Sequence, residues 1–113
     1  MIIHCIKSAE LVLSCLEKEY RDNPSEKVAK DIDIIKNKIN FYKNNFKQMP
    51  EIENRLYYKI AYEGKNIMKA CNEIADENYE KDIKPTDATH IYKYYYKKIK
   101  KYLNNNEITI EEM

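Results

Sequence analysis

The two histidines and three cysteines are the side chains that metal or nucleophilic chemistry would use first. They are His4, His90, Cys5, Cys15 and Cys71. The cysteines are odd in number and lack the paired short spacing of a zinc site, and neighbouring His4 and Cys5 would point about 100° apart on a helix. We therefore predict no catalytic residue, no metal site and no cofactor. Unpaired thiols are typical of an intracellular, cytoplasmic protein.

The segment Asp87-Ala88-Thr89-His90 is the one partial match to a bundle metal motif. Di-metal sites in helical bundles use Glu-x-x-His on two helices, with further carboxylates on facing helices. Here the segment stands alone at an expected helix start, where Asp87 or Thr86 is a good N-cap. The sequence favours capping, and a ligand-binding or metal-binding bundle is the third functional hypothesis.

Lysine and tyrosine dominate segment 91–102. On a helical wheel Tyr92, Tyr95 and Tyr102 fall on the isoleucine side, which indicates a buried face. The opposite face presents Lys93, Tyr94, Lys97, Lys100 and Lys101. Lysines can neutralise phosphates and an exposed tyrosine can stack on an unpaired base, so this face is a candidate nucleic-acid site. A solvated basic helix face is the simpler interpretation.

A second outward set lies earlier in the chain, with two tyrosines one helical turn apart, basic neighbours, and two apolar residues a heptad apart. Its members are Ile34, Phe41, Arg55, Tyr58, Tyr62 and Lys65. Exposed tyrosine and arginine are enriched where proteins dock. We predict that these six residues contribute to a protein-interaction surface, although a core wider than the main helix seam would also account for them.

Composition excludes several other classes of protein. The chain has 113 residues, 43% of them hydrophobic and 35% charged, which fits one folded domain rather than a disordered chain. Its formal net charge is +1, so any nucleic-acid binding must be local. No stretch approaches the roughly 20 apolar residues of a membrane span, so we expect no membrane association. The lysine-, isoleucine- and asparagine-rich composition suggests AT-rich coding, typical of a low-GC microbe, an archaeon or a virus.

Hydrophobic periodicity predicts an all-α protein with helices over 2–21, 24–48, 51–82 and 87–103. Asn23 is the expected N-cap of the second helix, with Pro24 at its first position. Pro50 is expected to break the chain, and Gly64 to bend the third helix or allow close helix approach. The expected buried residues are Leu13, Ile35, Ile39, Ile60, Ile67 and Ile99.

Short connections between these helices favour an antiparallel up-down-up-down four-helix bundle over 1–103, followed by an acidic tail, 104–113, that frays or docks. An alternative joins the second and third helices into one long helix kinked at Pro50, which a dimer would have to cover. In either case the tip carrying Phe46, Met49, Ile52 and Leu56 is a candidate for self-association.

The leading functional hypothesis is therefore a small non-enzymatic protein-interaction module that binds itself or another protein. The runner-up is a small nucleic-acid-binding protein that uses the basic face of the fourth helix.

Overall fold

The computed structural model describes residues 1–103 and 107–110, and its fold is all-α. The first helices are α1 (Ile6–Asp22), α2 (Glu26–Gln48), α3 (Glu51–Tyr57), which continues into the π-helical turn η1 (Tyr58–Tyr62), and α4 (Ile67–Glu80). The last helix consists of four consecutive parts: α5 (Ala88–Ile91), the π-helical turn η2 (Tyr92–Tyr96), α6 (Lys97–Ile99) and the 3₁₀ turn η3 (Lys100–Tyr102). We call this last helix, 88–102, the basic helix. The strands are β1 (Ile2–Ile3) and β2 (Ile108–Thr109).

The long helix α2 is the element along which α1 and α3 pack. Ile32, Ile35, Ile39 and Tyr42 form its buried stripe, at the spacing the sequence predicts. Its N-cap is Ser25, whose hydroxyl accepts a hydrogen bond of 3.2 Å from the Lys27 amide. The expected cap at Asn23 is therefore wrong by two residues, and Pro24 precedes the helix rather than opening it.

The chain reverses direction at Pro50. The side-chain amide of Asn54 donates a 2.7 Å hydrogen bond to the backbone carbonyl of Phe46, and the Tyr42 and Tyr57 rings stack at 5.1 Å. In one continuous helix these two tyrosines would be about 22 Å apart. The alternative of a long helix kinked at Pro50 is therefore wrong, and the turn back also covers the tip, where Leu56 is fully buried.

The helix expected over 51–82 is interrupted at Gly64. Gly64 adopts φ of +76°, a left-handed conformation that ends η1, and Asn66 then caps α4 by accepting a 2.8 Å hydrogen bond from the Lys69 amide. A Cβ at Gly64 would lie 3.1 Å from the Cβ of Cys5, so the glycine also permits close approach of the start of α1.

The basic helix begins as expected, with the Asp87 carboxylate accepting a 2.9 Å hydrogen bond from the Thr89 amide. The π-helical turn η2 then widens the helix and shifts its side chains relative to a regular α-helical wheel. Tyr96 packs against the core, whereas Tyr92 is 43% exposed. The expectation that Tyr92 is buried is wrong for this reason.

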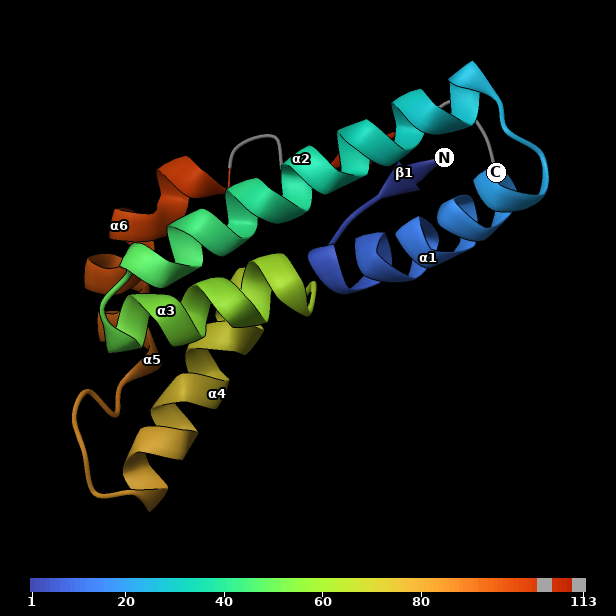
Figure 1. Ribbon diagram of the computed structural model, residues 1–113. Coiled ribbons are helices and arrows are strands. Elements are labelled where there is room, and N and C mark those ends of the chain that lie inside the picture. The colour runs from blue at the N-terminus through green and yellow to red at the C-terminus, as the bar shows by residue number, and fades with distance from the viewer. Residues whose placement is uncertain (104–106, 111–113) are drawn as a thin grey trace.

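The arrangement in space does not confirm the four-helix-bundle topology. Helix α1 packs along the N-terminal half of α2, and α3 packs along the C-terminal half. Both helices lie on the lower side of α2, one after the other (Figure 1). Helix α4 leads away below α3, and the basic helix packs against α3 and α4. The result is elongated, 53 × 24 × 22 Å.

The two ends of the chain meet. Strands β1 and β2 pair antiparallel, with Ile2 opposite Thr109 and Ile3 opposite Ile108. The expected start of the first helix at residue 2 is therefore wrong, because residues 2–3 form a strand and α1 begins at Ile6. The terminal ammonium of Met1 donates a 2.9 Å hydrogen bond to the Ile110 carbonyl. Ile108 and Ile110 are each 1% exposed, so the described part of the tail docks into the core, while 104–106 and 111–113 lie outside the described residues.

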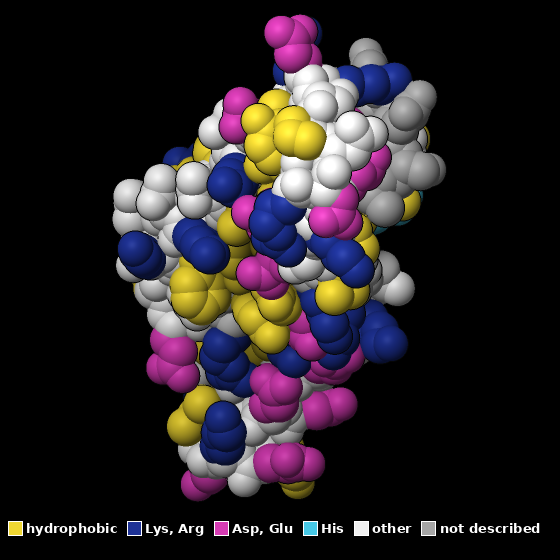
Figure 2. Space-filling model, turned by 45° about the vertical axis from the view of Figure 1, so that its right-hand side comes forward, with side chains coloured by type: hydrophobic (Ala, Val, Ile, Leu, Met, Phe, Trp, Pro, Cys, Tyr) yellow, Lys and Arg dark blue, Asp and Glu magenta, His cyan; other side chains and the backbone are white. Residues whose placement is uncertain are grey.

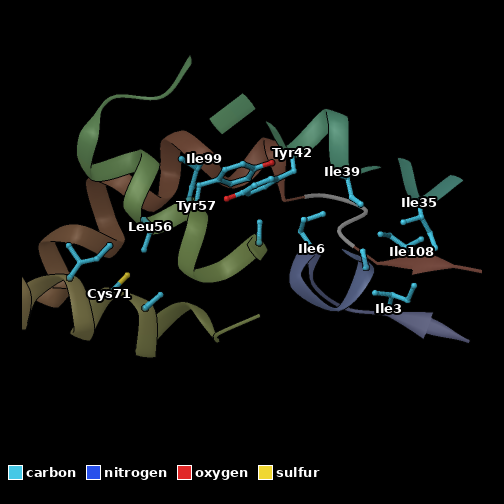
Figure 3. Packing of buried hydrophobic residues seen from close by; sticks show 14 of the residues in the cluster. Ile3, Ile6, Ile35, Ile39, Tyr42, Leu56, Tyr57, Cys71, Ile99 and Ile108 are labelled. Carbon is cyan, nitrogen blue, oxygen red and sulfur yellow. The ribbon is translucent and has the colours of Figure 1, made fainter. Parts of the chain in front are cut away.

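One hydrophobic core extends from the strand pair and the α1–α2 pair to α3, α4 and the basic helix. Figure 3 shows Ile3, Ile35 and Ile108 gathered at the strand end, and Leu56, Tyr57 and Ile99 at the other end. Of the six residues expected to be buried, Ile35, Ile39 and Ile99 are buried, and Leu13, Ile60 and Ile67 are half-buried against the core.

Candidate functional sites

An internal ion-pair network uses both basic residues of the expected protein-interaction set. Arg55 donates 2.8 and 2.6 Å hydrogen bonds to the Asn78 side chain and the Glu77 carboxylate, and Lys65 pairs with Glu73. Lys59 bridges both carboxylates, at 3.0 Å to Glu73 and 2.9 Å to Glu77. Arg55 and Lys59 therefore tie the α3–η1 segment to α4 across the Gly64 break, whereas Lys65 joins the segment that precedes α4 to α4 itself. The sequence contained no signal for the pairings across the break.

The network shifts the ionisation of its members. Hydrogen bonds from Lys65 and then Lys59 lower the pKa of Glu73 below its usual range. Burial opposes the charge of Glu77, but hydrogen bonds from Lys59 and Arg55 outweigh it and lower the Glu77 pKa. Burial likewise opposes the charge of Lys59, whose pKa is nevertheless raised by its two carboxylates. All of these groups are charged at neutral pH.

Tyr58 and Tyr62 form the aromatic part of the expected interaction set, and their rings stack at 4.9 Å. The Tyr62 hydroxyl donates a 2.6 Å hydrogen bond to Glu10 of α1, which, together with burial, raises the pKa of Tyr62 to about 12. Tyr62 is thus a half-buried link between η1 and α1. Tyr58 is 39% exposed and lines a surface depression of about 190 Å³ with Phe46 and Arg55.

Ile34 and Phe41, the apolar members of the set, lie elsewhere on α2. They are 40% and 52% exposed. Ile34 lines a different depression, beside Thr109 of β2. Phe46, which lines the depression beside Tyr58, lies about 18 Å from Ile34 along α2. The six residues of the set therefore do not form one compact patch.

The basic helix carries lysines that the rest of the chain does not neutralise. Among the described residues, Lys98 alone of its five lysines has a carboxylate within ion-pair distance, Glu53 at 3.5 Å. The other four are Lys93, Lys97, Lys100 and Lys101, and all four are exposed. Lys101 also lies 5.0 Å over the ring of Tyr102. The expected nucleic-acid set is therefore brought together on one helix.

Aromatic rings accompany these lysines. Tyr94 is 58% exposed and its ring lies 4.5 Å from that of His90, one turn earlier. Tyr92 stacks on Tyr96 at 5.4 Å with the rings nearly parallel. The sequence identified Tyr94 but missed His90 and Tyr92, the latter because the π-helical turn changes the helical register.

A groove between α1 and α2 was not anticipated. It has a volume of about 300 Å³ and is lined by Glu17, Tyr20, Arg21, Ala29, Ile32, Asp33 and Lys36. The sequence feature that could have indicated this groove is the pattern of charged residues flanking the apolar stripes of α1 and α2. Figure 2 shows one face of the molecule, on which hydrophobic side chains gather between basic and acidic groups.

Within the described chain, no three His, Cys, Asp or Glu side chains are grouped so that they could hold a metal ion. Cys5, Cys15 and Cys71 are free thiols. None of the helices in the described ranges is long and apolar enough to cross a membrane.

No protein-family model, curated protein sequence or solved structure matches this chain.

Proposed function

We propose that this protein binds nucleic acid through the basic helix. The observation that carries the proposal is the contrast between two sets of cations. Arg55, Lys59 and Lys65 are paired with carboxylates inside the molecule, whereas Lys93 and Lys97, together with the rest of the basic face, have no such partner among the described residues. Unpaired lysines on one helix are free to neutralise phosphates.

The exposed rings support the same function. Tyr94 stands among the lysines with most of its surface free, and a tyrosine ring can stack on an unpaired base. Tyr92 and His90 add two further exposed groups to the same helix. Near-neutral net charge limits any binding to this local face, since the field of the whole molecule contributes little.

The test is retention of RNA and DNA, single-stranded and duplex, at about 50 mM salt, where phosphate contacts are strongest. Lys97→Glu with Lys101→Glu should abolish binding, because two repulsive charges replace two phosphate contacts. Tyr94→Ala should weaken binding to single strands more than to duplex.

A matched control places the same two charge reversals elsewhere. Lys7 and Lys18 are exposed on α1, so Lys7→Glu with Lys18→Glu changes the net charge equally while leaving the basic helix intact. This control should bind as the unchanged protein does. Equal losses in both double variants would mean that overall charge, and not this helix, is responsible.

A protein-docking function is the second candidate, and the exposed Tyr58 beside its depression favours it. In affinity capture from the native host, Tyr58→Ala should then lose a specific partner that the control Tyr79→Ala retains, since Tyr79 is 77% exposed on α4.

We also propose an intracellular location, with which the three free thiols are consistent.

A further inference from the structure

The α1–α2 groove is an incompletely covered helix pair. Tyr20 continues the apolar stripe of α1, four residues after the fully buried Leu16, yet it is 41% exposed. Across the groove, Ile32 continues the stripe of α2, and Ala29 beside it is half-buried. Helices α3 and α4 lie toward the other end of α2, so among the described helices none covers the exposed side of Tyr20 at this end of the stripe (Figure 1).

Charges of both signs surround this apolar floor. Helix α1 contributes Glu17 and Arg21, and α2 contributes Asp33 and Lys36. Glu17 and Lys36 lie 3.8 Å apart with both side chains about half exposed, which is a weak pairing. Within the described residues Arg21 and Asp33 have no ion-pair partner. Each helix thus presents one acid and one base to anything that enters the groove.

We infer that a second copy of this chain binds here, so that two α1–α2 hairpins form a four-helix arrangement. A two-fold axis parallel to the helices would place α1 of one copy over α2 of the other. Arg21 then faces the partner's Asp33, and Glu17 faces the partner's Lys36. Each pairing occurs twice, and Tyr20 is covered by the partner's α2.

Charge complementarity is what selects a second copy as the occupant. A groove with charges of one sign would call for a partner of the opposite sign, whereas this one matches itself under a two-fold rotation. The covered residues would be a tyrosine and two aliphatic side chains surrounded by ion pairs, the usual anatomy of an interface centre and its rim.

Two complementary double variants test the contact directly. Arg21→Glu with Lys36→Glu makes all four groove charges acidic, and Glu17→Lys with Asp33→Lys makes all four basic. By sedimentation equilibrium the unchanged protein should dimerise at tens of micromolar. Each double variant alone should self-associate at least about a hundredfold more weakly, because like charges then face each other at four positions.

Mixing the acidic and basic variants in equal amounts should restore a dimer. That recovery separates a direct contact from simple unfolding, which mixing would not reverse. Lys93→Glu with Lys97→Glu, on the basic helix, is the control and should dimerise normally. The inference is overturned if the unchanged protein stays monomeric at several hundred micromolar, which would leave the groove to a different occupant. It is also overturned if both variants still dimerise, or if their mixture does not.

Discussion

The ammonium of Lys98 lies 3.5 Å from the carboxylate of Glu53, and the two side chains differ sharply in burial. The Glu53 side chain is 7% exposed and that of Lys98 is 65% exposed. Lys98 thus joins the basic helix to α3, while the neighbouring Lys97 and Lys101 have no described carboxylate partner. Lysines of one helix are therefore divided between holding the fold and facing solvent.

This division predicts that two similar substitutions change the stability by different amounts. Lys98→Gln should lower the free energy of unfolding by about 1 kcal/mol, because it leaves a nearly buried carboxylate without its counter-charge, partly offset by solvent near Lys98. Lys97→Gln should change the stability by less than about 0.5 kcal/mol. Urea denaturation of both variants measures the difference, and equal stabilities would contradict the structural role of Lys98.

Replacing Gly64 tests the junction between α1 and the end of η1. Gly64→Ala should destabilise the protein by about 1 to 3 kcal/mol, because alanine is strained at positive φ and its Cβ would crowd Cys5. Adding Cys5→Gly should recover only the steric part of the loss. A double variant no more stable than Gly64→Ala alone would show that the contact with Cys5 contributes nothing.

The docked tail predicts a large loss of stability from its buried isoleucines. Ile108→Ala should cost about 2 to 5 kcal/mol through lost burial and a residual cavity. The adjacent Thr109 is exposed, so Thr109→Ala is a matched control that should cost little. Thermal unfolding followed by circular dichroism measures both. A loss below about 1 kcal/mol for Ile108→Ala would mean that the strand pair is not formed in solution.

The network on α4 predicts a dependence of stability on pH. The pKa values of Glu73 and Glu77 are lowered in the folded state, so their contribution is present at neutral pH and is lost as pH falls through and below the ordinary glutamate range near 4.5. The raised pKa of Lys59 has the opposite sense, and its contribution is lost only in strongly alkaline solution.

The measurement is a series of urea denaturations from pH 7 to pH 3. The free energy of unfolding should fall with pH, and Glu77→Gln should make that fall shallower because one of the titrating carboxylates is gone. An unchanged slope in Glu77→Gln would show that the network does not couple to folding.

Sequence periodicity predicted the regular parts of this fold and missed the irregular ones. The stripe of α2, the break at Pro50 and the Asp87 cap each depend on local rules, so they could be read from the residues. At Gly64 the sequence allowed either a bend or a close helix approach, and the structure shows a full break with a left-handed glycine, the Asn66 cap and Cys5 close by. The π-helical turn η2 departs from the regular 3.6-residue spacing that a helical wheel assumes, and the wheel misplaced Tyr92.

The candidate sites likewise include some features that the sequence could predict and others that it could not. The exposed lysines of the basic helix follow from helical spacing and so could be predicted. The pairing of Arg55 with Glu77 could not, since it depends on how α4 folds back against α3. The docking of Ile108 and Ile110 was left open by the sequence because a short segment of alternating apolar residues has no defined partner until the first strand is placed.

The most direct test of the central claim is the salt dependence of nucleic-acid affinity, measured by fluorescence anisotropy between about 50 and 200 mM salt. Binding should weaken as salt rises, with a logarithmic slope of about 0.7 to 0.9 per phosphate contact. Lys93→Gln with Lys97→Gln should reduce that slope by roughly two contacts, while Lys7→Gln with Lys18→Gln leaves it unchanged. No binding at about 50 mM salt, or an unaltered slope in the basic-helix variant, would contradict the account.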